Sequence, residues 1–154
     1  MIGQLVDGAA LVAELVATNK DGALQELLAK AQDSGVFGAK LTKTLHKRML
    51  EREAMGSTGL GNGVAVPHVK SEGVDRVVLV LARCKKGLEW HAIDGRPVHV
   101  LFLLVSPADE PEMHLQCLRW IATLARNTDF RRFLLDAKDA QAMRDLLREM
   151  LPKV

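Results

Sequence analysis

The chain has 154 residues, of which 48% are hydrophobic and 26% charged, the balance of an ordinary globular protein with one domain. A net charge of +2, from 21 basic and 19 acidic side chains, argues against a nucleic-acid-binding protein, which carries a concentrated basic excess. The longest apolar stretches, such as residues 100–105, are far too short to insert into a membrane.

The N-terminal residues and the cysteines indicate a cellular compartment. Residues 1–7 have neither the basic region nor the apolar run of a signal peptide. Cys84 and Cys117 form no CxxC pair and lie in apolar runs, so buried, reduced thiols are expected. These features predict a cytoplasmic protein.

The first half of the chain predicts two helices followed by a short strand. Residues 11–17 are apolar, but their periodicity does not decide between a strand and a helical turn. From Asp21 apolar residues recur at helical spacing, with Gly35 as a natural stop. A second helix is expected over residues 39–55 and a short strand over residues 64–66.

The second half predicts two buried strands followed by helices. Residues 76–82 are β-branched and almost wholly apolar, which is typical of a strand buried on both faces. A turn at residues 95–97 leads to a second such strand over residues 98–105. Three helices are then expected, over residues 113–124, over residues 128–133 with Thr128 as the N-cap, and over residues 137–150. This order predicts an α/β fold in a single domain over residues 1–154, with a central sheet covered by helices on both faces.

The most unusual segment is glycine-rich and ends in a histidine. Residues 56–63 read GSTGLGNG and contain four glycines, and residues 64–68 continue as VAVPH. Glycines allow a positive φ and a close approach of the backbone to an anion, and Pro67 favours an extended Val66. The segment indicates one imidazole, that of His68, held beside a backbone-lined site for a phosphoryl group. A tight glycine turn without a ligand remains the alternative.

The sequence does not match the common motifs for nucleotide binding, serine hydrolysis or metal binding. A P-loop or a dinucleotide fingerprint begins a helix, whereas these glycines follow a predicted helix and precede a strand. There is no GxSxG nucleophile motif. The five histidines form no HxH, HExxH or Cys/His cluster, so no metal site is expected.

A phosphoryl group on His68 needs hydrogen-bond donors. A neutral imidazole is a nucleophile near neutral pH and can accept a phosphoryl group covalently. Backbone N–H groups of the glycine-rich loop would bind the phosphoryl oxygens, and hydroxyl groups would add further donors. The loop residues expected to do this are Ser57, Thr58, Gly61, Asn62 and Gly63. A purely structural role for His68 is the alternative.

Two further residues are candidates for the same site. Arg52 precedes the glycine-rich segment, and its guanidinium suits phosphoryl oxygens. The alternative is a surface ion pair with Glu51 or Glu53. His114 lies early in a predicted helix, where the N-terminal end favours a nearby anion. A solvent-facing histidine is its alternative, and spacing alone does not bring these side chains together.

These residues resemble a known family. Residues 50–53 and 56–68 closely resemble the signature of the IIA component of the bacterial phosphotransferase system, of the fructose, mannitol and nitrogen-regulatory class. Residues 87–98 and 113–118 resemble a further loop, strand and helix of that family. The resemblance extends from about residue 10 to residue 150 and is specific over the stretch that ends at His68.

The resemblance implies a role for each site residue. His68 would accept a phosphoryl group from the carrier protein HPr or its nitrogen-branch relative, and would pass it to a cysteine of a IIB domain. Arg52 and His114 match the positions that surround the phosphohistidine. The implied fold is a mixed central β-sheet sandwiched between helices, and neither a metal nor a cofactor is required. His91 and His99 depart from the family pattern and receive no role.

Two questions stay open at this level. Leu60, Val64 and Val66 either form an apolar rim for a docking partner or pack in the core. The protein is a phosphoryl carrier, a regulatory binding module switched by phosphorylation of His68, or a relative that has lost phosphorylation. The set of Arg52, His68 and His114 argues against the last of these.

Overall fold

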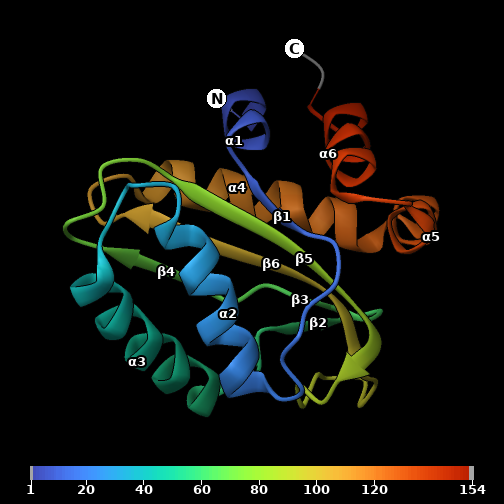
Figure 1. Cartoon of the computed structure of the whole chain (residues 1–154), viewed down its shortest axis with the longest axis horizontal. Coiled ribbons are helices and arrows are strands. Elements are labelled where there is room, and N and C mark those ends of the chain that lie inside the picture. The colour runs from blue at the N-terminus through green and yellow to red at the C-terminus, as the bar shows by residue number, and fades with distance from the viewer. Residues whose placement is uncertain (1, 153–154) are drawn as a thin grey trace.

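The structure is a computed structural model that describes residues 2–152 (Figure 1). The described elements in chain order are α1 (Ile2–Asp7), β1 (Ala10–Val12), α2 (Lys20–Gln32), α3 (Ala39–Met55), β2 (Gly59–Gly61), β3 (Val64–Ala65), β4 (His68–Ser71), β5 (Val78–Leu88), β6 (Val98–Pro107), α4 (Pro111–Arg126), α5 (Thr128–Asp136) and α6 (Ala140–Glu149).

The strands form one mixed sheet. Its order is β1-β5-β6-β3-β2, and β4 pairs with β6 as well. β5 and β6 are antiparallel, whereas β1 is parallel to β5, and both β3 and β4 are parallel to β6. The long apolar runs predicted as buried strands therefore become the central pair of the sheet.

Helices cover both faces of this sheet. In Figure 1, α2 and α3 lie over one face and α4 over the other. Alternate residues of β5 point to opposite faces, because successive side chains of a strand alternate. Val80 and Ala82 join the core under α2 and α3, whereas Leu79 and Leu81 join the core formed with α1, α4, α5 and α6. The predicted three-layer α/β/α fold is confirmed.

Two short consecutive strands, β3 and β4, pair with the same edge of β6. Val64 and Ala65 of β3 pair with Val100 and Leu101, and β4 resumes the pairing with His68 opposite Leu104. Between them lies Pro67, which has no N–H to donate but accepts a hydrogen bond from the Leu104 N–H at 3.0 Å. The proline therefore interrupts the strand, and His68 becomes the first residue of a new one.

Several boundaries differ from the sequence predictions. The helix over residues 39–55 is confirmed, and the undecided residues 11–17 begin in a strand, β1. Thr128 is not an N-cap: Asn127 takes that position, and its side chain accepts a hydrogen bond from Phe130 N at 2.9 Å. The last helix begins at Ala140, because the side chain of Asp139 caps it. α1, β2 and β4 were not predicted.

Candidate functional site

His68 projects from the start of β4 and is half-buried. Its Nδ1 lies 2.7 Å from the carbonyl oxygen of Val66. Because a carbonyl oxygen only accepts, this contact requires the proton on Nδ1. The lone pair of the neutral ring is then on Nε2, which is the nitrogen left to act as a nucleophile.

His114 faces His68 from the first turns of α4. The two ring centroids lie 5.5 Å apart, and the rings are tilted by 47°. His114 is only 6% exposed, and its Nδ1 lies 2.6 Å from Oγ of Ser106. Burial first, and then electrostatic interactions with His68 and Lys70, lower the pKa of His114 from 6.5 to about 4. His114 is therefore a neutral, buried imidazole at neutral pH and not a solvent-facing one.

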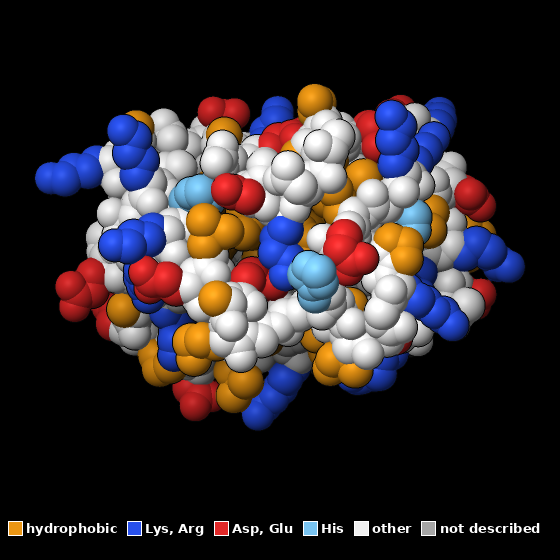
Figure 2. Space-filling view, turned by 90° about the horizontal axis from the view of Figure 1, so that it is seen from below, with side chains coloured by type: hydrophobic (Ala, Val, Ile, Leu, Met, Phe, Trp, Pro, Cys, Tyr) orange, Lys and Arg blue, Asp and Glu red, His pale blue; other side chains and the backbone are white. Residues whose placement is uncertain are grey.

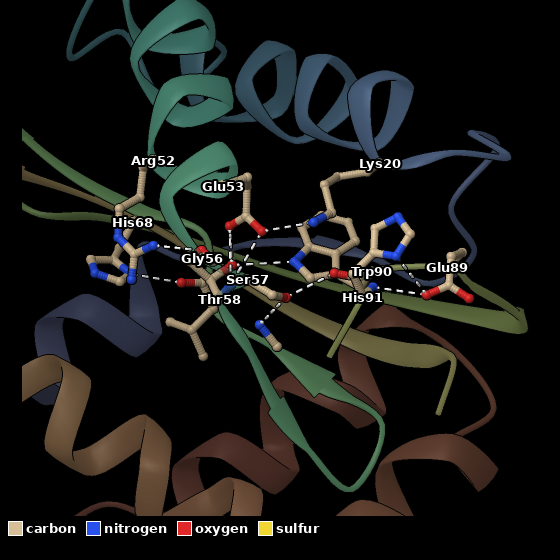
Figure 3. A network of polar contacts seen from close by, with 12 residues as sticks. Lys20, Arg52, Glu53, Gly56, Ser57, Thr58, His68, Glu89, Trp90 and His91 are labelled. Carbon is tan, nitrogen blue, oxygen red and sulfur yellow. Dashed lines mark hydrogen bonds and ion pairs between the residues drawn. The ribbon is translucent and has the colours of Figure 1, made fainter. Parts of the chain in front are cut away.

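Arg52 lies in the last turn of α3. Its Nη1 donates to the carbonyl of Gly56 at 2.6 Å, and Figure 3 shows the guanidinium on the same side of the Gly56–Thr58 segment as His68. One turn earlier, Arg48 donates to the carbonyl of Lys70 at 2.7 Å. The C-terminal half of α3 therefore contacts both the glycine-rich segment and the strand that carries His68.

Glu53 organises the segment between α3 and β2 (Figure 3). Its carboxylate accepts hydrogen bonds from the backbone N–H of Thr58 at 3.1 Å and from the Thr58 hydroxyl. It also pairs with Nζ of Lys20 at 3.0 Å, and its side chain is 5% exposed. The Lys20 ammonium lies 5.0 Å from the ring centroid of Trp90. The pairing of Glu53 with Lys20 takes the place of the surface ion pair considered for Arg52.

The two hydroxyl groups expected to bind phosphate are already engaged. Ser57 Oγ donates to the carbonyl of Trp90 at 2.8 Å and accepts from the N–H of Gly59 at 3.0 Å. The Thr58 hydroxyl donates to Glu53 and accepts from Nε1 of Trp90 at 3.2 Å. In this arrangement both hydroxyl protons hold the segment to its neighbours.

Gly61, Asn62 and Gly63 lie at the tip of the β2–β3 hairpin, away from His68. All three have a positive φ, of 87°, 57° and 78°, which a tight turn requires. The carbonyl of Gly63 accepts from Val100 N, whereas His68 pairs with Leu104. Four residues along β6 correspond to about 13 Å. The structure does not bring these three residues to His68, because the glycines form a turn instead.

The hairpin tip has its own partner. Asp94 accepts hydrogen bonds from the backbone N–H groups of Arg96 at 3.1 Å and Asn62 at 3.0 Å. These bonds to backbone N–H groups, that of Arg96 first, hold the pKa of Asp94 below its usual value. The backbone donor of Asn62 is therefore already used by a carboxylate.

The apolar candidates divide between core and surface. Val64 and Val66 are buried in the core beside α4, whereas Leu60 is 46% exposed. Met55 and Ile93 are also exposed, by 85% and 91%. Figure 2 shows the face seen from below Figure 1, where hydrophobic, basic and acidic side chains are interspersed.

The remaining histidines lie outside this arrangement. His91 is exposed with a φ of 55°, and His99 contacts the carbonyl of Cys84 at 3.0 Å. Within residues 2–152, no group of three or more His, Cys, Asp or Glu side chains is arranged to hold a metal ion. Cys84 and Cys117 are free and buried, as predicted. In the same described range, no helix has the length and apolar character needed to cross a bilayer.

Sequence reasoning missed four residues of this region: Lys20, Glu53, Trp90 and Ser106. Glu53 adjoins Arg52, and its single signal was a carboxylate in the last turn of a helix, where the dipole disfavours it. Lys20 and Trp90 lie more than 30 residues from their partners in the sequence. Ser106 was the first polar residue after a buried strand, a position that also suits a simple strand end.

Comparison with known proteins gives concordant results. The nitrogen regulatory protein of Bradyrhizobium diazoefficiens is 34% identical over 146 residues, which cover 95% of this chain and 94% of that protein. The fructose-specific EIIA component of the phosphotransferase system of Haloferax volcanii is 33% identical over 132 residues, covering 86% and 84% of the two chains.

Among solved structures, the nitrogen regulatory protein IIA-Ntr of Neisseria meningitidis superposes with a TM-score of 0.82 at 26% identity. The superposition covers 95% of this chain and 98% of that one. The model of the family described as "Phosphoenolpyruvate-dependent sugar phosphotransferase system, EIIA 2" matches residues 5–150. With this match over nearly the whole chain and a fold of the same kind, the chain belongs to the EIIA 2 family of the phosphotransferase system.

Proposed function

We propose that this protein is a phosphoryl carrier of the phosphoenolpyruvate-dependent phosphotransferase system, acting as a single IIA domain in the cytoplasm. His68 accepts the phosphoryl group from HPr or from its nitrogen-branch relative. The group then passes to a IIB partner, or its presence on His68 serves as a regulatory signal. The observation that carries this proposal is the pair of facing imidazoles of His68 and His114, 5.5 Å apart.

The hydrogen bond of His68 prepares it for this step. The lone pair of Nε2 attacks the phosphorus atom of the donor phosphohistidine, and the P–N bond of the donor breaks as the new bond forms. The donor imidazole retains the electron pair of the broken bond. The proton on Nδ1 of His68 stays hydrogen-bonded to the Val66 carbonyl, which stabilises the positive charge that develops on the ring.

Arg52 and His114 have complementary roles in this proposal. The guanidinium of Arg52 turns from the Gly56 carbonyl to the phosphoryl oxygens, where it is a charge-assisted donor. His114 is neutral and buried and donates one hydrogen bond to a phosphoryl oxygen without adding charge. Transfer between two imidazoles requires positioning and charge stabilisation, with no metal or cofactor.

A second candidate function uses the same chemistry as a switch. The relatives from Bradyrhizobium diazoefficiens and Neisseria meningitidis are both described as nitrogen regulatory proteins. In this reading, phosphorylated and unphosphorylated His68 present different charges to regulated target proteins, which bind one form better than the other. No onward transfer to a sugar is then required.

The experiment is phosphorylation from phosphoenolpyruvate, with HPr or the nitrogen-branch carrier as donor. We expect one acid-labile phosphate per chain in the wild-type protein and none in His68→Ala. His91→Ala is the matched control, because the His91 side chain is exposed and pairs with Glu89 and not with His68 or His114. Equal labelling of His68→Ala and the wild type would contradict the proposal. The preferred donor distinguishes the sugar and nitrogen branches.

A further inference from the structure

Ser106 lies near the end of β6 and is completely buried. Its Oγ lies 2.6 Å from Nδ1 of His114, which is the one polar contact of this hydroxyl among the described residues. Every buried side-chain nitrogen and oxygen in residues 2–152 has a hydrogen-bond partner. The contact between Ser106 and His114 is therefore the bond that satisfies this hydroxyl.

The direction of this hydrogen bond follows from the need of the Ser106 hydroxyl proton for an acceptor. If His114 carried its proton on Nδ1 and donated to Ser106, the hydroxyl proton of Ser106 would be buried without an acceptor. Leaving a buried donor without an acceptor is unfavourable, because the group has lost its hydrogen bond to water. If Ser106 donates instead, its proton and the Nδ1 lone pair are both satisfied. The ring proton of neutral His114 is then on Nε2.

We propose that Ser106 is a positioning residue that fixes His114 in the tautomer with the proton on Nε2. The hydroxyl also fixes the orientation of the ring, since the bond is short and the site is buried. His114 consequently offers a donor, and not a second lone pair, to any anion held between the two rings.

The two histidines thereby have opposite tautomers. The Val66 carbonyl requires the proton of His68 on Nδ1, whereas Ser106 requires that of His114 on Nε2. His68 supplies the lone pair that accepts a phosphoryl group. His114 supplies an N–H that donates to the phosphoryl oxygens. The role of Ser106 and His114 in phosphoryl transfer rests on the function proposed for His68. The tautomer of His114 is independent of that function.

The test begins with a readout that needs no phosphorylation. Long-range ¹H–¹⁵N correlation spectra of the full chain at neutral pH distinguish protonated from unprotonated ring nitrogens. We expect the wild-type His114 signals of the tautomer with the proton on Nε2. In Ser106→Ala we expect a large share of the opposite tautomer, because Nδ1 has lost its donor.

Two variants of nearly equal side-chain volume distinguish the effect of the Ser106 hydroxyl from the effect of packing. Ser106→Thr and Ser106→Val add nearly the same volume to the buried position, and only Thr retains the hydroxyl. We expect Ser106→Thr to keep the wild-type tautomer and Ser106→Val to lose it. Because overpacking can prevent folding, near-UV circular dichroism establishes the fold, and Ser106→Ala, which leaves space, remains informative.

The second readout is the rate of phosphoryl acceptance by His68. We expect a decrease of about tenfold in Ser106→Ala and Ser106→Val, the loss of one hydrogen bond to a charged group, and near wild-type rates in Ser106→Thr. An unchanged tautomer in Ser106→Ala would overturn the proposal. A changed tautomer with an unchanged rate would overturn the role in transfer. Absence of label from the wild type would instead overturn the function proposed for His68.

Discussion

Glu53 accepts a hydrogen bond from the backbone N–H of Thr58 at 3.1 Å, so the last turn of α3 holds the chain that leaves it. The same carboxylate is paired with Lys20, and both side chains are largely buried. A buried charge is tolerated only where its partners are in place. The carboxylate of Glu53 therefore holds the Gly56–Thr58 segment at its Thr58 end, and the hydrogen bond from Ser57 Oγ to the Trp90 carbonyl holds it beside Trp90.

Replacing Glu53 by Ala should destabilise the protein by about 3 kcal/mol, because it leaves the Lys20 charge buried without its partner. Phosphoryl acceptance should also slow, since the segment that contacts Arg52 loses its anchor. Urea unfolding measures the first effect and labelling the second. Glu51→Ala is the matched control, because Glu51 is exposed on the same helix, and it should change stability by less than about 0.5 kcal/mol. Equal stabilities of the two variants would refute this role of Glu53.

The sequence predicted best those features that depend on local pattern. The stripe of Leu45 and Met49 and the stop at Gly56 gave the bounds of α3, because helical periodicity and a glycine after the last turn are local signals. The continuous apolar run of β5 indicated a strand with both faces covered. The motif and the resemblance predict Arg52, His68 and His114 as site residues, and the structure places the rings of His68 and His114 5.5 Å apart.

Features that depend on tertiary contacts were not predicted. The sequence predicts Gly61 and Gly63 at the phosphoryl site because a glycine-rich loop offers backbone N–H donors to an anion. Pro67 and the pairing with β6 instead separate the hairpin tip from His68 by several residues along one strand. The partners of Glu53 and His114 come from other elements, so no local pattern indicates them.

The position of the hairpin tip has a direct consequence for Asn62. Asn62→Ala should cost about 1 kcal/mol of stability, because an alanine tolerates the left-handed φ of 57° less well. The rate of phosphoryl acceptance should be unchanged, since the tip is about 13 Å along β6 from His68. Thermal unfolding and labelling kinetics measure the two effects. A tenfold slower acceptance in folded Asn62→Ala would place the tip at the site.

The free energy of unfolding should decrease as the pH falls, because His114 becomes protonated. The pKa of His114 is about 4 in the folded protein against an ordinary value of 6.5, so the unfolded chain binds this proton more readily. The contribution is fully present above about pH 6.5 and is lost as the pH falls towards 4. It amounts to about 3 kcal/mol over this range.

The comparison of His114→Gln with the wild type isolates this effect. Urea unfolding at a series of pH values should show a shallower decrease below pH 6.5 in the variant. His91→Gln, at an exposed position, should keep the wild-type slope. If His114→Gln also keeps it, then His114 is not held neutral by burial.

The buried thiols should be unreactive in the folded protein. Burial raises the pKa of the Cys117 thiol to about 11, and the thiolate is the reactive form. Iodoacetamide at pH 8 should therefore modify Cys117 only after denaturation, as measured by mass spectrometry. Met55→Cys supplies an exposed thiol as a positive control. Rapid modification of Cys117 in the native protein would show that this core opens readily.

The atom that carries the phosphoryl group is the most direct test of the role proposed for His68. Phosphorylation of ¹⁵N-histidine-labelled protein from phosphoenolpyruvate and the carrier, followed by NMR of the ring nitrogens, identifies the modified atom. We expect a phosphoryl group on Nε2 of His68, with the proton still on Nδ1 against the Val66 carbonyl. A phosphoryl group on Nδ1 of His68, or on His114, would contradict the proposed role of His68.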